Sequence, residues 1–158
     1  GTLAALLERA TLMIPDLPAA SIGSSLLFEA SGRGDVQPVT QSLLVEARAI
    51  RPLAPVHISA ERRADGTLAL CWIRRSRFDP GWTDFSDQPV GEERLEFDVK
   101  ISSGGSTLHS VGVAESSTEV STAIIEGWGL PSGATVELQV RQLGQFAISH
   151  PATHSFQI

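Results

Sequence analysis

The feature that most constrains the fold of this chain is the alternation of apolar and polar residues from residue 55 to its end. In residues 93–102, for example, Leu95, Phe97, Val99 and Ile101 alternate with polar residues such as Glu96, Asp98 and Lys100. A period of two places successive side chains on opposite faces of a strand, so one face is buried and the other faces water. Runs of this kind, separated by turn residues, predict strands at 55–61, 67–73, 93–102, 107–113, 118–124, 135–143 and 153–158.

Seven strands in about 104 residues have the spacing of an all-β sandwich of two packed sheets. No convincing amphipathic helix is found in this part of the sequence, which argues against parallel sheets built from βαβ units. The core is expected to be a seam between the two sheets. Its predicted members are Leu68, Leu70, Trp72, Phe97, Val99, Leu138 and Val140.

The first 52 residues follow a different pattern. Residues 3–14 are apolar on nearly all sides, which fits either a buried strand or a short helix. Residues 24–30 and 41–47 share the pattern S-L-L-x-E-A and are expected to pair as strands around a turn. That turn contains RGD at 33–35, which is integrin-binding in other settings, but a turn built on Gly32 and Gly34 is the better interpretation of three residues.

Two prolines, Pro52 and Pro55, restrict the backbone and mark the joint between the two parts. We therefore predict a β-rich segment at 1–52 and a sandwich at 53–158. The first segment is too short for a large core of its own. It is interpreted as the end of a preceding domain, or as a small layer packed on the sandwich.

Charge and composition exclude several classes of function. The formal net charge is −6, which argues against binding to the phosphate backbone of nucleic acids. Cys71 is the only cysteine, so neither an intrachain disulfide nor a cysteine zinc site can form. No apolar run reaches the roughly 20 residues that span a bilayer, so no membrane insertion is expected. The sequence lacks an initiator Met and a signal peptide, and we interpret it as a piece of a longer protein.

No motif for catalysis, a cofactor or a metal is found. The four histidines are scattered over different predicted strands, and Pro151 separates His150 from His154, which argues against a helical metal pair. Carboxylates gather in and beside one long loop, at Asp79, Asp84, Asp87, Glu92 and Glu93. An acid–base pair among them is one interpretation and solvated loop acids are the other, which we prefer. We expect no enzymatic activity.

Residues 55–158 resemble a fibronectin type III domain. The resemblance is carried by LALCW at 68–72, FDVKI at 97–101 and GLPSGATVELQV at 129–140. It implies a seven-stranded sandwich with the tryptophan in its core. Val136 stands where the family usually has tyrosine, and the chain has no tyrosine, so the family's tyrosine-corner hydrogen bond must be missing.

A second resemblance is to the tail-tip hub (host-specificity) proteins of siphophage-type tails, and among them those of the gene transfer agents of alphaproteobacteria. It rests on blocks that occur in the same order: RPL at 51–53, PVH at 55–57, WIRRSR at 72–77, Trp82, and PVGE at 89–92. It implies a structural or adhesive module of a baseplate hub in the virion tail tip, made in the bacterial cytoplasm. The implied partners are other tail or baseplate subunits, further copies of the chain in the assembled tail, or a host-surface polysaccharide.

The residues chosen as the candidate binding surface follow the strand at 67–73; they are Arg74, Arg75, Arg77, Trp82 and Phe85. The arginines either form a cationic patch for a partner or pair with Glu92, Glu93 and Glu96 on the neighbouring strand, and we prefer the pairing. As a patch, charge reversal at Arg74 and Arg77 should weaken assembly and leave thermal stability nearly intact. Trp82 and Phe85 lie in a loop of about 18 residues, and such long loops often bind a partner or fold back over a sandwich end.

Two other functions remain as alternatives. A carbohydrate-binding module would expose Trp82, Phe85 and Trp128 together on one face, although Trp128 is interpreted here as a structural turn residue. The accessory domain of a glycoside hydrolase would use the loop acids on a sugar.

Overall fold

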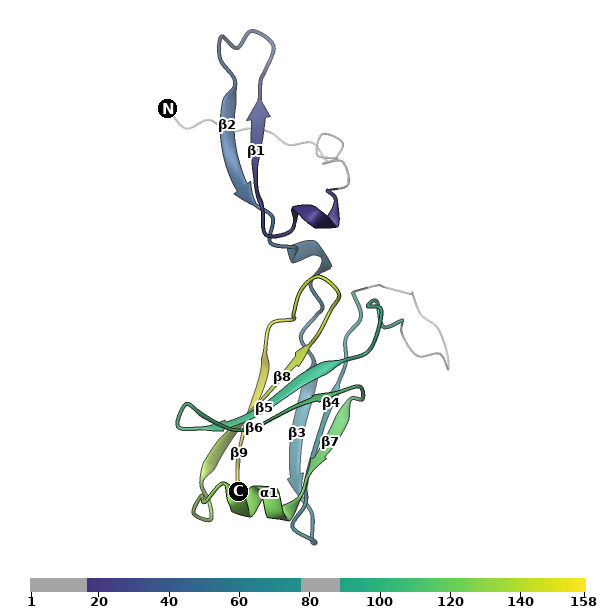
Figure 1. The fold of residues 1–158 in the computed structure, drawn as a ribbon, viewed down its shortest axis with the longest axis vertical. Helices are drawn as coiled ribbons and strands as arrows, with labels where there is room; N and C mark the ends of the chain where they lie inside the picture. Colours follow the sequence, from purple (N-terminus) through teal and green to yellow (C-terminus); the bar gives the residue numbers. More distant parts are fainter. Residues whose placement is uncertain (1–16, 78–88) are drawn as a thin grey trace. The chain divides into compact units, whose positions relative to one another are not determined.

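The computed structural model describes residues 17–77 and 89–158, and the chain divides into two compact units between Arg48 and Ala49. The first unit contains a short 3₁₀ turn, η1 (Ala19–Ser21), and a hairpin of β1 (Ser25–Ala30) and β2 (Val39–Leu44). A second 3₁₀ turn, η2 (Arg48–Ile50), leads into the sandwich. Figure 1 shows these elements in chain order.

The predicted hairpin is confirmed, with a shifted second strand. The strands β1 and β2 pair antiparallel, with Ser25 opposite Leu44 and Ala30 opposite Val39. β2 therefore ends before residues 45–47, which were predicted to be strand. Val45 still exchanges backbone hydrogen bonds with Gly23 and Ser24, and Ala47 then adopts a positive φ of 54°, which a strand does not accommodate. In the connecting turn Gly34 has φ of 99°, and the Asp35 carboxylate accepts a hydrogen bond from the Gly32 amide.

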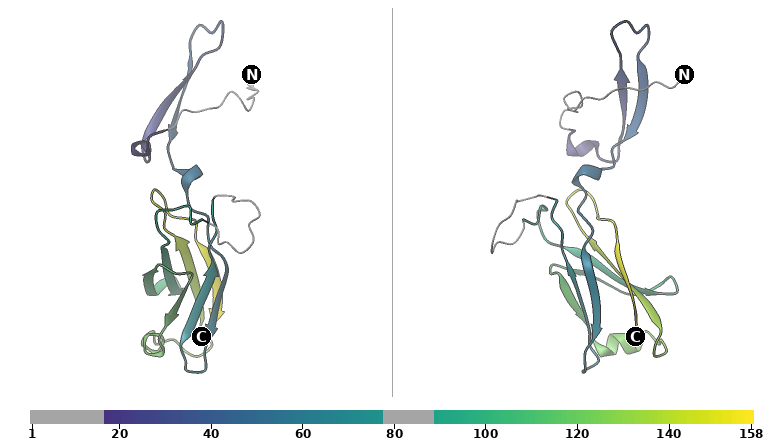
Figure 2. Two further views of the ribbon diagram at one scale, coloured as in Figure 1. Left: turned by 90° about the vertical axis from the view of Figure 1, so that its right-hand side faces the viewer. Right: turned by 180° about the vertical axis from the view of Figure 1, so that it is seen from behind.

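The second unit is a sandwich of two antiparallel sheets, as predicted. β3 (Val56–Arg62), β4 (Leu68–Ile73) and β7 (Ser117–Val120) form one sheet in the order β3-β4-β7. β5 (Phe97–Ser103), β6 (Ser106–Val113), β8 (Thr135–Gln142) and β9 (Ala152–Gln157) form the other in the order β6-β5-β8-β9. Figure 2 shows the sandwich from two further directions. All seven predicted strands are present.

The predicted seam is the core of the sandwich. All seven side chains named from the sequence are buried, together with Ile101, Val120, Ile125 and Val136. Trp72 meets Phe97 edge-to-face across the two sheets, with ring centroids 5.3 Å apart. The strand predicted at 93–102 begins only at Phe97, because the chain still bends at residues 91–94.

One prediction about this unit is wrong, because a short helix, α1 (Thr122–Gly127), occupies part of the strand predicted at 118–124. The chain turns after Val120, and the Ser121 carbonyl accepts from the amides of Ile124 and Ile125. Ile125 is the buried residue of this helix. A helix of less than two turns is too short for its period to be recognised in a sequence. Helix α1 and the C-terminus lie at the same end of the sandwich (Figure 1), where Gly133 donates to the Ile158 carbonyl.

Strand β3 contains a β-bulge at its start. The register with β4 shifts between Val56 and Ser59, and His57 has φ of 51°, in the left-handed region that side-chain-bearing residues seldom adopt.

No helix in the described ranges, 17–77 and 89–158, is long and apolar enough to cross a membrane.

Candidate functional site

The candidate surface begins where β4 ends. Strand β4 stops at Ile73, and Arg74–Arg77 lead away from the sheet toward residues 78–88. Trp82 and Phe85 belong to that range and lie outside the described residues, as do Asp79, Asp84 and Asp87. The chain returns at Pro89 and reaches β5 through residues 91–96. The arginines can therefore be placed, and the aromatic half of the predicted surface cannot.

Arg77 is held in a mostly buried ion pair with Glu92. Its Nε and Nη2 donate to Glu92 Oε1 at 2.9 and 2.8 Å, and Nη2 also donates to the Gly91 carbonyl at 2.9 Å. The Arg77 side chain is 19% exposed and that of Glu92 only 5%. A charged pair this far from water keeps its stability only when its hydrogen bonds are satisfied, as they are here. The pairing preferred from the sequence is thus found for Arg77 with Glu92.

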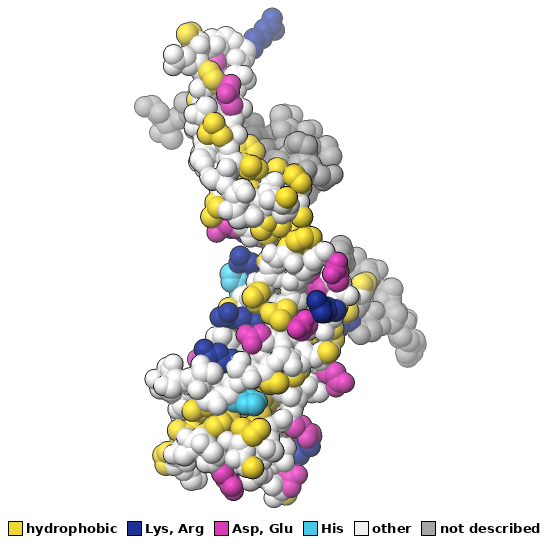
Figure 3. Space-filling view, viewed as in Figure 1, with side chains coloured by type: hydrophobic (Ala, Val, Ile, Leu, Met, Phe, Trp, Pro, Cys, Tyr) yellow, Lys and Arg dark blue, Asp and Glu magenta, His cyan; other side chains and the backbone are white. Residues whose placement is uncertain are grey.

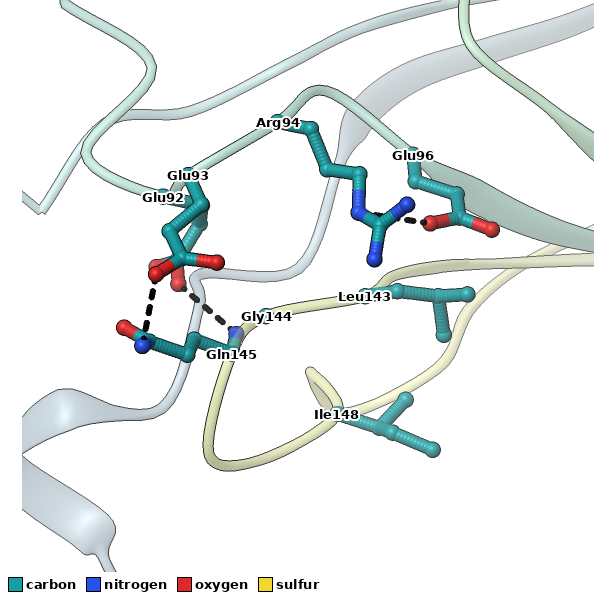
Figure 4. Close-up of a pocket in the computed structure, with 8 residues that line it drawn as sticks. All are labelled: Glu92, Glu93, Arg94, Glu96, Leu143, Gly144, Gln145 and Ile148. Atoms are coloured by element: carbon teal, nitrogen blue, oxygen red, sulfur yellow. Dashed lines mark hydrogen bonds and ion pairs between the residues drawn. The ribbon is translucent and has the colours of Figure 1, made fainter. Parts of the chain in front are cut away.

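The second oxygen of Glu92 reaches the loop between β8 and β9. Glu92 Oε2 accepts from the Gln145 amide at 3.3 Å, and the Gln145 side chain donates to Glu93 at 2.7 Å (Figure 4). Gly144 lies so close that a Cβ there would be 2.5 Å from Pro52 Cγ and 2.8 Å from Glu92 Oε2. We call Pro52, Arg77, Gly91, Glu92, Gly144 and Gln145 the Arg77–Glu92 cluster.

This cluster draws together segments that are distant in the sequence. Three of the sequence blocks that carry the second resemblance contribute to it. The block at 51–53 contributes Pro52, the block at 72–77 contributes Arg77, and the block at 89–92 contributes Gly91 and Glu92. Nearby, Arg74 donates to the Pro89 carbonyl at 3.4 Å, and Arg51 bonds His150 at 2.9 Å. Sequence reasoning missed Gly144 and Gln145, because a glycine after a strand gives no sign of which distant atoms crowd it.

Among the three arginines, Arg75 has an exposed side chain, whereas Arg74 and Arg77 are half-buried. Charge reversal at Arg77 would place two carboxylates against each other in a nearly dry site. We therefore expect charge reversal at Arg77 to lower thermal stability, contrary to the expectation from the sequence. Arg75, whose side chain is exposed, is the better residue for testing the surface. Figure 3 shows side chains of both charges on the visible face of the sandwich.

A groove of about 400 Å³ lies beside the cluster. Its lining is Glu92, Glu93, Arg94, Glu96, Leu143, Gly144, Gln145 and Ile148 (Figure 4). Arg94 and Glu96 are 3.6 Å apart in an exposed pair, and Glu92 is already bonded to Arg77. Among the residues that the structure describes, none that lines this groove is aromatic.

The histidines lie in separate places. His57 is in the β3 bulge, His109 is on β6, His150 bonds Arg51, and His154 stacks on Phe156. Within ranges 17–77 and 89–158, no group of three or more His, Cys, Asp or Glu residues is arranged to hold a metal ion. Trp128 packs against the core and its indole nitrogen is buried, in keeping with the structural role expected for it.

Comparisons with known proteins identify the fold. No family model matches the chain, and no curated protein matches it in sequence. Domains d3–d4 of the rat CD45 extracellular region align with a TM-score of 0.51 and 11% identity, over 100% of this chain and 78% of that one.

Two further solved structures align less well. A two-domain fibronectin type III segment of chicken tenascin gives a TM-score of 0.45 at 16% identity, over 85% of this chain and 62% of that one. The Clostridium perfringens spore cortex lytic enzyme SleM gives 0.45 at 10% identity, over 68% of this chain and 28% of that one. The chain thus spans less than two thirds of either protein. The predicted fold class, an all-β fibronectin type III-like sandwich, is confirmed by the two packed sheets and by the alignment with CD45, and at 11% identity that likeness concerns the fold alone.

Proposed function

We propose that this chain is a structural and adhesive module of a phage-like tail-tip baseplate hub protein. In this proposal it has no catalytic activity and no cofactor. It contacts neighbouring tail or baseplate subunits, or the host surface, through the end of the sandwich that carries Arg75 and the groove beside Glu93 and Arg94.

The observation that carries the proposal is the set of sequence blocks shared with such hub proteins. The blocks at 51–53, 72–77 and 89–92 each contribute to the Arg77–Glu92 cluster, so their side chains depend on one another. Interdependence of this kind gives a physical reason why such blocks would occur together. It supports treating the blocks as one structural unit.

The carbohydrate-binding alternative has less support. It requires Trp128 on an open aromatic face, and Trp128 instead packs against the core. Stacking of a sugar on aromatic rings needs those rings free. A glycan array probed with the wild-type chain separates the two functions, since saturable binding there would favour the carbohydrate-binding module.

The test of the hub proposal uses Arg75→Glu in the full parent protein, produced in its native host. Particles would be purified, and the protein would be sought at the tail tip by immunogold electron microscopy. We expect wild-type protein at the tip and less incorporation of the Arg75→Glu protein. Arg62→Glu is the matched control, because Arg62 is exposed and lies at the other end of the β3–β4 ladder. Absence of the wild-type protein from tail particles would refute the proposal.

A further inference from the structure

Strand β6 has the longest edge without a neighbour among the described elements of the sandwich. Each sheet has two end strands, which are β3 and β7 in one sheet and β6 and β9 in the other. β3 and β9 lie beside each other. β7 has only four residues, and one of them, Glu119, is paired with Arg63. β6 has eight residues, Ser106–Val113, and within the described ranges it pairs with β5 alone.

The sequence of β6 lacks the residues that usually protect an edge strand. Between Ser106 and Val113 there is no Asp, Glu, Lys, Arg or Pro. Natural sheets block their edges with such residues or with bulges, because the free N–H and C=O groups of an end strand pair readily with another chain. The ladder between β5 and β6 has a register shift at Ile101 and Ser102, which leaves residues 109–113 regular. We call residues 109–113 the open edge.

One face of the open edge is apolar. Val111 and Val113 lie opposite Val99 and Phe97, whose side chains are fully buried, so the two valines face the core. Both pack against the core and remain only partly buried. A strand added beside them would cover the rest of this apolar surface in addition to pairing the backbone.

We propose that the open edge pairs with the open edge of a second copy of the chain, antiparallel and about a two-fold axis. An axis perpendicular to the sheet keeps the core-facing residues of both copies on one side. Opposite residues in an antiparallel ladder share a face, so the axis passes through a residue, and full overlap of residues 109–113 puts it at Val111. Ser110 then lies opposite Gly112 of the second copy. The two four-stranded sheets join into one continuous sheet.

Charge favours a second copy as the occupant of this edge. A chain of net charge −6 repels its own copies across charged surfaces, but the open edge carries no Asp, Glu, Lys or Arg. The nearest charged side chains on this sheet, Asp98 and Lys100, belong to β5. In the pair each lies at least three strand spacings, about 14 Å, from its equivalent, which exceeds the screening length of about 8 Å. The inference needs only this chain and does not depend on the proposed function.

Two double variants test the pairing through charge. Ser110 and Gly112 are exposed on the outer face of β6, away from the core. Ser110→Glu with Gly112→Glu places like charges opposite each other across the axis, whereas Ser110→Glu with Gly112→Lys places opposite charges there. Sedimentation equilibrium of the 158-residue chain gives the Kd of each dimer. We expect a wild-type Kd of about 10 μM to 1 mM, at least about tenfold higher in the first variant and no higher in the second.

The matched control is Thr153→Glu with Ser155→Glu on β9, the other end strand of the same sheet. Both residues are exposed on the outer face. Ser155 lies opposite Glu137 as Gly112 lies opposite Asp98, so each glutamate variant adds one carboxylate beside an existing one. We expect this control to change the Kd by less than about twofold, because its charges are far from the open edge.

Hydrogen exchange of the wild-type chain at low and high protein concentration locates the interface. We expect protection of amides in residues 109–113 to rise with concentration, while protection in β9 stays constant. Absence of that rise would overturn the proposal, and this measurement decides if a variant fails to fold.

Three results of the sedimentation experiment would also overturn the proposal. One is a chain that stays monomeric up to about 1 mM, which would leave the open edge to a strand of another protein. A second is a dimer that the glutamate variants of β6 and β9 weaken equally. The third is a dimer that the Gly112→Lys variant weakens as much as the Gly112→Glu variant does.

Discussion

Gly144 lies in the loop after β8, where three atoms crowd the position that a side chain would occupy. A Cβ there would lie 2.5 Å from Pro52 Cγ, 2.8 Å from Glu92 Oε2 and 2.9 Å from the Ala147 carbonyl oxygen. We expect Gly144→Ala to lower the free energy of unfolding by about 1–3 kcal/mol, because a ring, a buried carboxylate and the backbone must all shift. Chemical denaturation followed by tryptophan fluorescence measures the change.

The control for that prediction is Gly112→Ala in β6. A Cβ there would meet only the Phe97 carbonyl oxygen, at 3.9 Å, so the change should stay within about 0.5 kcal/mol. Equal effects at the two glycines would show that Gly144 is not sterically constrained.

A second residue, His57, is constrained by its backbone conformation. Its φ of 51° places it in the left-handed region, while its side chain is exposed. We expect His57→Val to cost about 1–2 kcal/mol, since a β-branched residue is strained there, and His57→Asn to be nearly neutral. Thermal unfolding of the two variants measures the difference. If Val is tolerated as well as Asn, the bulge must relax without cost.

These two residues also show where reading the sequence fails at the residue scale. The buried position of Trp72 could be predicted, because the alternation around it is local. The constraint on Gly144 comes from Pro52 and Glu92, which are more than 50 residues away in the chain. The constraint on His57 comes from a bulge, which a period of two does not reveal.

At the scale of elements, the Arg77–Glu92 pair connects the segment that follows β4 to the segment before β5. We expect Arg77→Ala and Glu92→Ala each to lower the free energy of unfolding by about 2–4 kcal/mol, since each leaves a mostly buried charge without its partner. The double variant should cost less than the sum of the two, which a double-mutant cycle by chemical denaturation measures.

The matched control for this cycle is the pair of Arg63 and Glu119, which are 2.6 Å apart with side chains 51% and 55% exposed. Its coupling should be at most about 1 kcal/mol because water screens an exposed pair. A coupling at Arg77–Glu92 no larger than in this control would remove the argument that the shared sequence blocks form one structural unit.

The strands themselves were the most predictable elements. β4, β5 and β8 each bury one face, so the alternation of Leu68 with Ala69, or of Val99 with Lys100, reflects their position in the sheet. The ends of elements were less predictable. Ser121 precedes a helix in which only Ile125 is buried, and Ala47, just beyond β2, has a positive φ. A helix of six residues and a single backbone angle both leave no periodic pattern in the sequence.

At the scale of the whole molecule, the division between Arg48 and Ala49 predicts two units that lose their structure separately. Leu138 is fully buried in the sandwich, so Leu138→Ala should lower the stability of that unit by about 2–5 kcal/mol. Hydrogen exchange should therefore become faster in residues 49–158 and stay unchanged in β1 and β2. Leu43→Ala is the reciprocal variant, since Leu43 belongs to the hairpin. It should speed exchange in the hairpin alone. If either variant accelerates exchange in both units together, the chain unfolds as one cooperative body and its two units are not independent.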